Sequence, residues 1–261
     1  HNSKMTRLEL NLRDMYIAPP GSLLVACDAS QIELRLSAIY SRCERMLTAY
    51  ALGADIHRLN AAVIFNKLPA DITSEERYFG KKFSYMVIYC ASAKAVQRVF
   101  LVDEQILVPI STINQWIRNF NTVYPEILQF VNELVRCVKA GEKSELVHSA
   151  YVLRNSFGRL RRLQDHPQHL FNVIANSPQQ STVADHMLQA MQRVDARKHA
   201  GKIVLQVHDE ILMEVPASYA QEAAILLQEE MEKPIQIYGS LHSIPAEPTI
   251  GASWGHMKGE K

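Results

Sequence analysis

Short apolar runs bounded by turn residues lie near both ends of the chain, and long stretches with helical spacing lie between them. The run 23–27 follows two prolines and a glycine at 19–21, which predicts a turn and then a buried strand. Residues 203–215 predict a hairpin that Pro216 ends, and residues 245–254 predict a last strand. The chain therefore supplies its strands from segments that are far apart in sequence.

Helical spacing dominates the middle of the chain. Residues from about 45 to 125 have it, with breaks at Gly53, Pro69 and Pro109 and no convincing strand, which predicts a helical insertion. Ser30 lies three residues before Glu33, the spacing of a capping box, so a helix is expected to begin there. Further helices are expected over residues 126–139, 177–198 and 217–232, and short strands around a turn at Gly158 over 146–163.

The order of these elements predicts the fold class. Distant strands connected by helical blocks favour an α+β fold, in which an antiparallel sheet carries helices on one face, over an alternating parallel α/β fold.

Composition narrows the possible classes of protein. With 261 residues and 48% hydrophobic residues, the chain is expected to form a globular core, and no apolar run reaches the roughly 18 residues of a membrane span. The formal charge of +1 means that any nucleic-acid binding must come from local clusters of cations. The four cysteines form no CxxC pair, which argues against a structural zinc site or a disulfide scaffold and favours a reducing cytosol.

Two aspartates end apolar runs in separate parts of the chain. Asp28 follows the run 23–27, and Asp209 lies at the expected tip of the hairpin. If the two tips are neighbours, the carboxylates make a site for Mg²⁺, which prefers oxygen ligands and is usually held by one or two carboxylates plus substrate phosphates. Each aspartate taken alone is more simply explained as a turn or cap residue.

A second candidate site lies on one face of an expected helix. Arg77, Lys81, Tyr85 and Tyr89 are spaced four residues apart, which places them within an arc of about 120°. Two cations followed by two aromatic hydroxyls suit a nucleoside triphosphate. The alternative is an amphipathic helix with a solvated face, although exposed tyrosines at this spacing are less expected there.

Cations also cluster around Gly158 in the short-strand region. Arg154, Arg159, Arg161 and Arg162 could hold nucleic-acid phosphates, which position a duplex without reading its sequence. A solvated surface turn is the alternative. Asn176 and Gln180, four residues apart at the expected start of a helix, could contact a base or sugar edge.

Three motifs in this order resemble the DNA polymerase I family (family A). Residues 28–35, Asp-Ala-Ser-Gln-Ile-Glu-Leu-Arg, resemble its motif A, usually written DYSQIELR. The Arg77, Lys81, Tyr85, Tyr89 series resembles its fingers-helix motif B, and residues 207–210, Val-His-Asp-Glu, resemble its motif C. Residues 55–57, 124–125 and 158–159 agree as well, so the resemblance extends from about residue 12 to 254.

The resemblance implies a right-hand polymerase palm, formed by residues 1–48 and 126–261, with helical fingers over 49–125. It implies that Asp28 and Asp209 are ligands of two Mg²⁺ ions, with Glu210 as an accessory catalytic carboxylate. Lys81 would be the acid for pyrophosphate departure, and Arg77 would bind the triphosphate of a dNTP.

The remaining roles follow from the same resemblance. Tyr85 would sense the 3′ side of the sugar, Tyr89 would stack near the nascent base pair, and Glu33 would exclude a ribose 2′-hydroxyl. Gln31 is expected near the nucleotide and His208 near the primer terminus. The residues expected near a DNA template-primer are Arg159, Arg161, Asn176 and Gln180.

The chain departs from the family pattern at several positions. The tyrosine after the first aspartate is Ala29, the Asn-Phe-Gly of the fingers helix reads Ser84-Tyr85-Met86, and the glycine after the last tyrosine is Cys90. These changes concern placement of the template base more than the metal chemistry. The thumb and any exonuclease domain are expected to be absent, so either the chain is a fragment or the missing parts lie on a separate chain.

Three functions remain open from sequence. The first is a DNA-templated DNA polymerase, acting in the cytoplasm of a cell, in a phage host or in an organelle matrix. The second is a single-subunit RNA polymerase, against which Glu33 argues. The third is a palm and fingers subunit that binds DNA or a partner chain and is active only with separate thumb and exonuclease parts.

Overall fold

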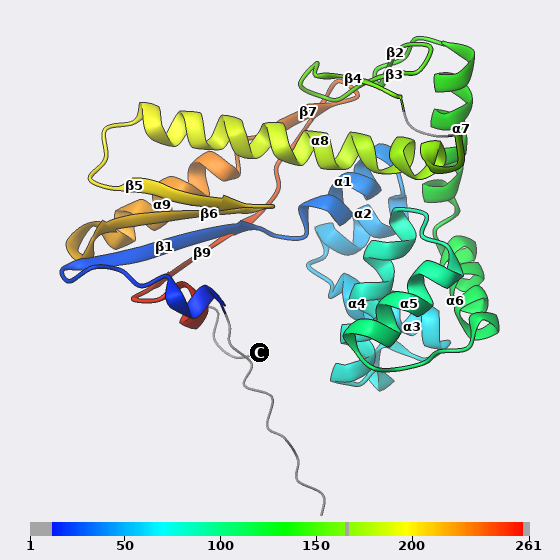
Figure 1. Ribbon diagram of the computed structural model, residues 1–261, viewed down its shortest axis with the longest axis horizontal. Coiled ribbons are helices and arrows are strands. Elements are labelled where there is room, and N and C mark those ends of the chain that lie inside the picture. Colours follow the sequence, from blue (N-terminus) through cyan, green and yellow to red (C-terminus); the bar gives the residue numbers. More distant parts are fainter. Residues whose placement is uncertain (1–11, 165–166, 258–261) are drawn as a thin grey trace, which may run out of the picture. The chain divides into compact units, whose positions relative to one another are not determined.

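The computed structural model describes residues 12–164 and 167–257, which fold into two compact units (Figure 1). Unit 1 contains the described residues 12–30, 183–235 and 241–257. Unit 2 contains residues 31–164, 167–182 and 236–240.

Unit 1 is built on a four-stranded sheet in the order β5, β6, β1, β9, in which every neighbouring pair is antiparallel. The strands are β1 (Ser22–Ala29), β5 (Lys202–Val207), β6 (Glu210–Pro216) and β9 (Ala246–Gly251). The predicted antiparallel sheet and the predicted hairpin are therefore confirmed, and the last strand is shorter than the range 245–254.

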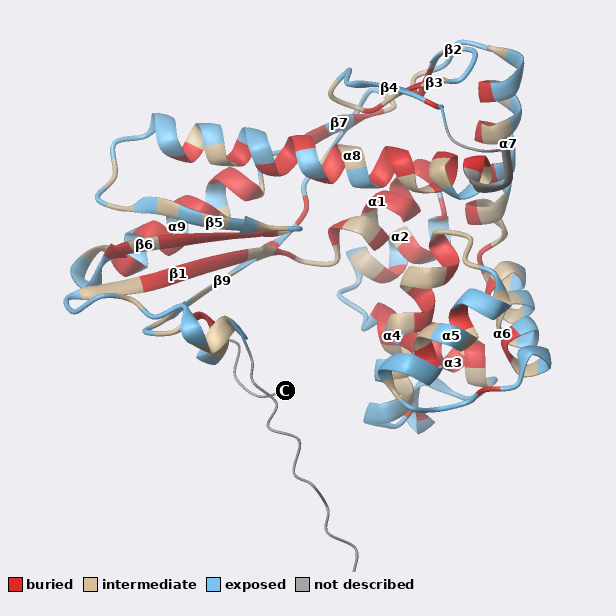
Figure 2. Ribbon diagram, viewed as in Figure 1, coloured by how far each residue is buried: buried red, intermediate tan, exposed pale blue. Residues whose placement is uncertain are grey.

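Side chains alternate between the two faces of this sheet. Leu24 and Ala26 of β1 form a cluster with Trp254 and Met257, while α9 (Ala220–Met231) also packs against β1. Because β1 is covered on both faces, its residues 24–27 are all buried, which accounts for the unbroken apolar run in the sequence (Figure 2).

Polar contacts join the second half of α8 (Pro167–Ala196) to α9 within unit 1. Arg193 Nε donates to a Glu230 carboxylate oxygen at 3.0 Å, and Arg197 donates to the other oxygen at 2.9 Å. A His186 ring nitrogen lies 2.8 Å from the Met231 carbonyl oxygen. Glu230 is buried but paired twice, so the contact couples the two helices without leaving a buried charge alone.

Unit 2 is mainly helical, which confirms the predicted helical stretch. Its helices are α1 (Ile32–Ser41), α2 (Glu44–Ala51), α3 (Ile56–Phe65), α4 (Ser74–Ile88), α5 (Ala93–Asp103), α6 (Ile110–Val123) and α7 (Pro125–Ala140). Phe83, Phe100 and Phe120 are fully buried in its core, where Trp116 meets the rings of Phe83 and Phe100 edge-on and Phe83 meets the ring of Phe120 in the same way. The helix α7 ends where Gly141 takes the left-handed conformation (φ 72°), as predicted.

Three short antiparallel strands complete this unit: β2 (Val147–Ser149), β3 (Val152–Arg154) and β4 (Leu160–Arg162). Gly158 lies in the β3–β4 turn with φ 86°, which is the turn that the sequence predicts. A further two-stranded ladder pairs β7 (Ile235–Ile237) with β8 (Ser240–His242).

Two helix starts differ from the predictions. Ser30 does not cap α1, because its N–H still donates to the Pro245 carbonyl at 2.8 Å, and Gln31 precedes the helix in the left-handed conformation without a side-chain cap. The helix α8 begins at Pro167, ten residues before the predicted start, and contains Pro178 in its interior. Asn176 and Gln180 therefore lie inside α8 and not at its start.

No helix within 12–164 and 167–257 has both the length and the hydrophobicity that a membrane span requires. All four cysteines are free thiols.

Candidate functional site

The two predicted metal ligands are brought together by strand pairing in unit 1. Asp28 of β1 is the register partner of Glu210, the first residue of β6, and the Ala29 N–H donates to the Asp209 carbonyl at 2.9 Å. His208 and Asp209 form the two-residue turn between β5 and β6, with His208 at φ 53°. Asp28 and Asp209 are thus backbone neighbours on adjacent strands, and both are half-buried.

Glu210 lies next to this pair but has partners of its own. It is 4% exposed, one carboxylate oxygen accepts a 3.0 Å hydrogen bond from Trp254 Nε1, and the other lies 3.5 Å from an Arg13 guanidinium nitrogen. These contacts hold the carboxylate against the sheet. Its role as an accessory catalytic group stays a prediction.

A third carboxylate that the sequence did not single out flanks Asp28 from the other side. Glu247 of β9 is the register partner of Asp28 in the β1–β9 ladder, so acids from three adjacent strands follow one another across the sheet. Like charges directly opposite each other are destabilising unless a cation compensates them. The pKa of the neighbouring Cys27 thiol is raised to about 12, first by burial and then by the negative charges of Asp28, Glu232, Glu210 and Glu247.

The donor set at this edge suits a hard cation that substrate helps to bind. Among the described residues, no three His, Cys, Asp or Glu side chains converge into a group that could hold a metal by themselves. Asp28 and Asp209 supply only oxygen donors, the kind that Mg²⁺ prefers, and Mg²⁺ commonly completes its shell with water and phosphate oxygens. The residues present therefore fit a magnesium site that is completed by a polyphosphate.

The predicted cationic face lies on α4 in unit 2. The helix begins with a capping box, in which the Thr73 hydroxyl accepts from the Glu76 N–H at 3.2 Å and a Glu76 carboxylate oxygen accepts from the Thr73 N–H at 3.1 Å. Lys81 is exposed. Tyr85 and Tyr89 are half-buried and pack on the core of the unit, their roles at a nucleotide stay predictions, and Tyr89 is the residue that ends the helix.

Arg77 on this face is paired with an acid of the neighbouring helix. Its Nε donates to an Asp55 carboxylate oxygen at 2.5 Å, and Asp55 also caps α3 by accepting from the Arg58 N–H at 3.1 Å. Partial burial pushes the pKa of the Asp55 carboxyl upward, but the hydrogen bonds from Arg77 and Arg58 outweigh it and leave that pKa below its ordinary value. An anionic ligand of Arg77 has to compete with this carboxylate.

His57 is a candidate residue to which sequence reasoning gave no role. It is 3% exposed, its ring lies 6.1 Å from that of Tyr85, and its Nδ1 is buried with no hydrogen-bond partner in the described part of the chain. Burial, followed by the charges of Lys81 and Arg77, lowers its pKa to about 4, so the ring is neutral at pH 7. The only sequence feature that could have identified His57 is its place two residues after Asp55, at the start of a helix.

Gln31 and Glu33 lie at the start of α1, also in unit 2. The Tyr50 hydroxyl donates to Gln31 Oε1 at 3.3 Å, and the Arg35 guanidinium lies 4.1 Å from the centre of the Tyr50 ring. These contacts fix the amide of Gln31. Glu33 is half-buried in the first helical turn, and its role as a sugar gate stays a prediction.

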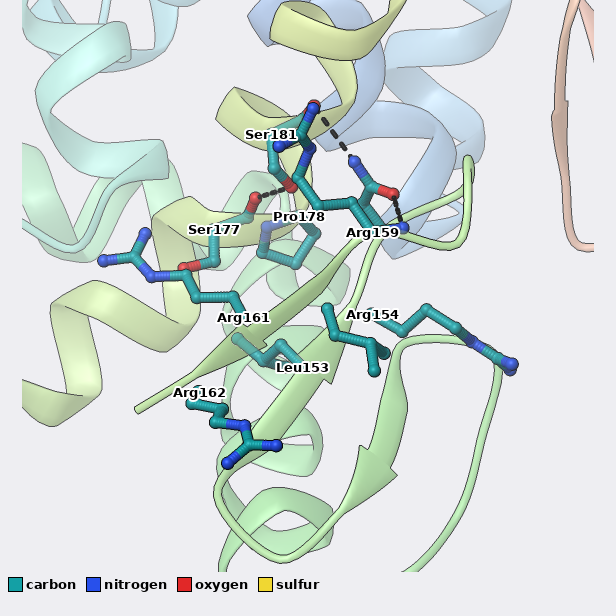
Figure 3. Close-up of a pocket in the computed structure, with 10 residues that line it drawn as sticks. Leu153, Arg154, Arg159, Arg161, Arg162, Ser177, Pro178 and Ser181 are labelled. Carbon is teal, nitrogen blue, oxygen red and sulfur yellow. Dashed lines mark hydrogen bonds between the residues drawn. The ribbon is translucent and has the colours of Figure 1, made fainter. Parts of the chain in front are cut away.

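The predicted arginines line a pocket between the β3–β4 hairpin and the first half of α8 (Figure 3). The pocket has a volume of about 340 Å³ and is lined by Leu153, Arg154, Asn155, Arg159, Leu160, Arg161, Arg162, Ser177, Pro178 and Ser181. None of these ten described residues is acidic. We refer to it as the arginine pocket.

The side chain of Asn155 builds one wall of the arginine pocket. Its Oδ1 accepts from the N–H groups of Phe157 and Arg159 at 3.0 and 2.9 Å, and its Nδ2 donates to the Ser181 carbonyl at 3.0 Å. One buried amide thus shapes the hairpin turn and ties it to α8. Of the two predicted contacts on α8, Asn176 is half-buried and Gln180 is exposed, and neither lines the pocket.

The site residues divide between the two units. Asp28, His208, Asp209 and Glu210 belong to unit 1, and the residues of α1, α4 and the arginine pocket belong to unit 2. Strand pairing accounts for the first group, and the packing of α3 on α4 accounts for the cationic face.

Sequence comparison identifies relatives over nearly the whole chain. DNA polymerase I of Streptococcus pneumoniae serotype 4 is 32% identical over 251 residues, which cover 91% of this chain and 26% of that protein. The thermostable DNA polymerase I of Thermus thermophilus is 28% identical over 257 residues, which cover 97% of this chain and 29% of that protein. The chain thus spans between a quarter and a third of the length of these relatives.

Comparison of structures agrees. The POL domain of Pol1 from M. smegmatis, in complex with DNA primer-template and dNTP, matches with a TM-score of 0.77 and 25% identity over 94% of this chain and 42% of that chain. The sequence model of DNA polymerase family A matches residues 3–256. The α+β arrangement of helices and antiparallel strands is therefore that of a polymerase palm with fingers, and the chain belongs to DNA polymerase family A.

Proposed function

We propose that this chain is the catalytic region of a DNA-templated DNA polymerase, which adds deoxynucleotides to a primer 3′ end with release of pyrophosphate. The observation that carries the proposal is the pairing of β1 with the β5–β6 turn, which makes Asp28 and Asp209 backbone neighbours. Two oxygen-donor side chains at one sheet edge are what a two-metal phosphoryl transfer requires of a protein.

Asp28 and Asp209 would hold two Mg²⁺ ions. When bound, such ions activate the attacking hydroxyl and stabilise the leaving pyrophosphate oxygen. Glu210 would support the pair from its buried position beside Trp254.

The α4 face would bind the incoming nucleotide. Arg77 would exchange its Asp55 partner for the triphosphate, and exposed Lys81 would give a proton to the departing pyrophosphate. Tyr85 would contact the 3′ side of the sugar and Tyr89 the nascent base pair. Glu33 would exclude a ribose 2′-hydroxyl, while Gln31, fixed by Tyr50, would lie near the nucleotide.

The template-primer would be held by separate groups. Arg159 and Arg161 of the arginine pocket suit the backbone phosphates, because the described residues that line the pocket include four arginines. Asn176 and Gln180 on α8 would contact the duplex, and His208 in the β5–β6 turn would lie by the primer terminus. In this assignment residues 1–48 and 126–261 act as palm and 49–125 as fingers.

The compartment and a partner chain are also part of the proposed function. The four free thiols support action in the cytoplasm or another reducing compartment. A separate chain that carries thumb and exonuclease functions would assist this one on DNA.

Primer extension with Mg²⁺ tests the proposal. The Asp209→Asn variant is expected to lose extension by at least about 1,000-fold while keeping its circular dichroism spectrum, since it removes a metal ligand and not a packing contact. Asp195→Asn, which changes an exposed acid of α8 in the same unit, is the matched control and is expected to keep full activity. Substantial extension by Asp209→Asn would refute the assignment.

Two further outcomes would favour the alternative functions. A gel shift with primer-template DNA but no nucleotide incorporation, even after co-purifying chains are added, would identify a subunit that binds DNA without catalysis. Incorporation of ribonucleotides in preference to deoxynucleotides would identify an RNA polymerase.

A further inference from the structure

The helices α3 and α4 approach each other at a glycine. A Cβ atom added at Gly80 would lie 2.6 Å from the Ala61 Cβ and 2.8 Å from the Ala61 Cα. Carbon atoms do not approach that closely, and the obstructing atoms are backbone or directly attached to it. The spacing of the two helices therefore depends on the missing side chain at position 80.

A hydrogen bond between fully buried side chains lies one turn further along the same contact. Asn60 of α3 donates from Nδ2 to the Ser84 Oγ at 2.9 Å, and Ser84 Oγ donates to the Gly80 carbonyl at 2.6 Å. Asn60 and Ser84 are both 0% exposed. Asn60 Oδ1 has no hydrogen-bond partner in the described part of the chain, so the amide is buried at a cost that an apolar side chain would avoid.

This buried pair lies directly beside the nucleotide-binding face of α4. Gly80 and Ser84 precede Lys81 and Tyr85 by one residue each, so the two rows are adjacent on the helix surface. A rotation or shift of α4 against α3 would move both rows together.

The helix α3 contributes to the same face from its own first turn. It carries Asp55, which pairs with Arg77, and His57, whose ring lies 6.1 Å from that of Tyr85. The contact around Asn60 therefore sets the position of groups on both helices.

We propose that Asn60 is a positioning residue for nucleotide binding, which acts through its hydrogen bond to Ser84 and fixes the register of α4 on α3. The inference rests on the proposed function, in which the α4 face binds a dNTP.

Four variants of the full chain test this inference. Asn60→Ala and Ser84→Ala each remove one partner, and the exchange variant Asn60→Ser/Ser84→Asn restores an amide and a hydroxyl with their helices swapped. Ser41→Ala is the matched control, because Ser41 is buried in α1 and donates to the carbonyl four residues earlier at 2.7 Å, as Ser84 does.

Isothermal titration calorimetry with dATP and Mg²⁺ measures nucleotide affinity without requiring turnover. We expect the dissociation constant to rise about tenfold in Asn60→Ala and Ser84→Ala, because the phosphate-binding side chains of α4 would no longer be held in place before the nucleotide binds. It should return to within about twofold of the parent in the exchange variant and stay unchanged in Ser41→Ala. Affinity for primer-template DNA, measured at the same temperature, should not change in any of them.

Specific results would overturn the inference. The inference fails if both single variants keep the dATP affinity of the parent, or if the exchange variant binds dATP no better than the single variants. It also fails if Ser41→Ala loses as much affinity, because that would show a general effect of losing a buried hydrogen bond. A parent chain that binds dATP in the expected pattern but never extends a primer would instead refute the proposed polymerase function and leave the positioning role standing.

Discussion

Asp28 lies between Glu210 and Glu247 in the register of three adjacent strands, so each neighbour opposes it with a charge of the same sign. Such an arrangement costs stability unless a cation is present, since like charges directly opposite destabilise a sheet by about 0.2–1 kcal/mol per pair. We therefore predict that a cation bound beside Asp28 would raise the stability of unit 1.

The first prediction follows from this opposition of charge. In buffer containing EDTA, Asp28→Asn is expected to raise the free energy of unfolding by about 1 kcal/mol and the Tm by about 2–4 °C. Addition of 10 mM Mg²⁺ should stabilise the parent but not the variant. Differential scanning calorimetry of the parent, Asp28→Asn and the control Asp195→Asn measures this, and a destabilised Asp28→Asn protein in EDTA would contradict it.

The strands β1 and β6 of unit 1 could be predicted because their apolar runs are short, bounded by turn residues and buried on both faces. The proximity of Asp28 and Asp209 was only a condition in the strand prediction, and it was the resemblance to family A that implied it. The flanking Glu247 could not be found in the same way, because its position opposite Asp28 is set by the register between two strands more than 200 residues apart, which no local pattern encodes.

The errors at helix starts have a related cause. Ser30 has a good capping sequence, yet its N–H is bound to the Pro245 carbonyl, so a tertiary contact decides against the local preference. Proline is common in the first turn of helices, which favoured a helix start near Pro178. In the structure Pro178 lies inside α8, because the residues before it are also helical. His57 was missed because its place beside Tyr85 depends on how α3 packs on α4.

The second prediction concerns the pair formed by Arg77 and Asp55. Asp55→Asn keeps an N-cap side chain on α3, because asparagine caps as well as aspartate, but removes the charge that competes for Arg77. Both side chains are more than one-third exposed, so stability should change by less than about 1 kcal/mol. The dissociation constant for dATP is expected to fall about two- to fivefold in a calorimetric titration.

Two observations make this prediction specific. Asp71→Asn removes an exposed acid from the same unit and should leave dATP affinity unchanged. The gain in Asp55→Asn should also disappear when Arg77 is replaced by alanine, and persistence of the gain in that double variant would show that the pair is not its source.

The third prediction is a pH dependence that arises from His57. Its pKa of about 4 in the folded chain lies below the ordinary value near 6.5, so the unfolded chain binds the extra proton between these values. Stability from this group is therefore full above about pH 6.5 and is lost as the pH falls toward 4, by on the order of 3 kcal/mol.

Urea unfolding at pH 7.5, 6 and 5 measures this dependence. His57→Gln should flatten the decline, and His148→Gln, which changes an exposed histidine, should leave it unaltered. Some decline should remain in His57→Gln, because burial also lowers the pKa of His186. An identical pH profile for His57→Gln and the parent would contradict the assignment.

The fourth prediction concerns the arginine pocket. Arg161 and Arg162 lie on the exposed strand β4, and within the described residues neither forms an ion pair, so their charges are available to phosphates. Each alanine variant is expected to weaken primer-template binding by a similar factor for every DNA sequence, because phosphate contacts carry no base information. Each should also lower the slope of log K against log salt by about 1.

Arg136 supplies the control for this measurement. It is an exposed arginine of the same unit, but its guanidinium is already paired with Glu133 and Glu142 at 2.6 Å each, so Arg136→Ala should leave the salt slope unchanged. Fluorescence anisotropy with a labelled primer-template at several KCl concentrations compares the three variants. Equal slopes for Arg136→Ala and Arg161→Ala would mean that the pocket does not contact the DNA backbone, whereas a loss confined to one DNA sequence would indicate base recognition instead.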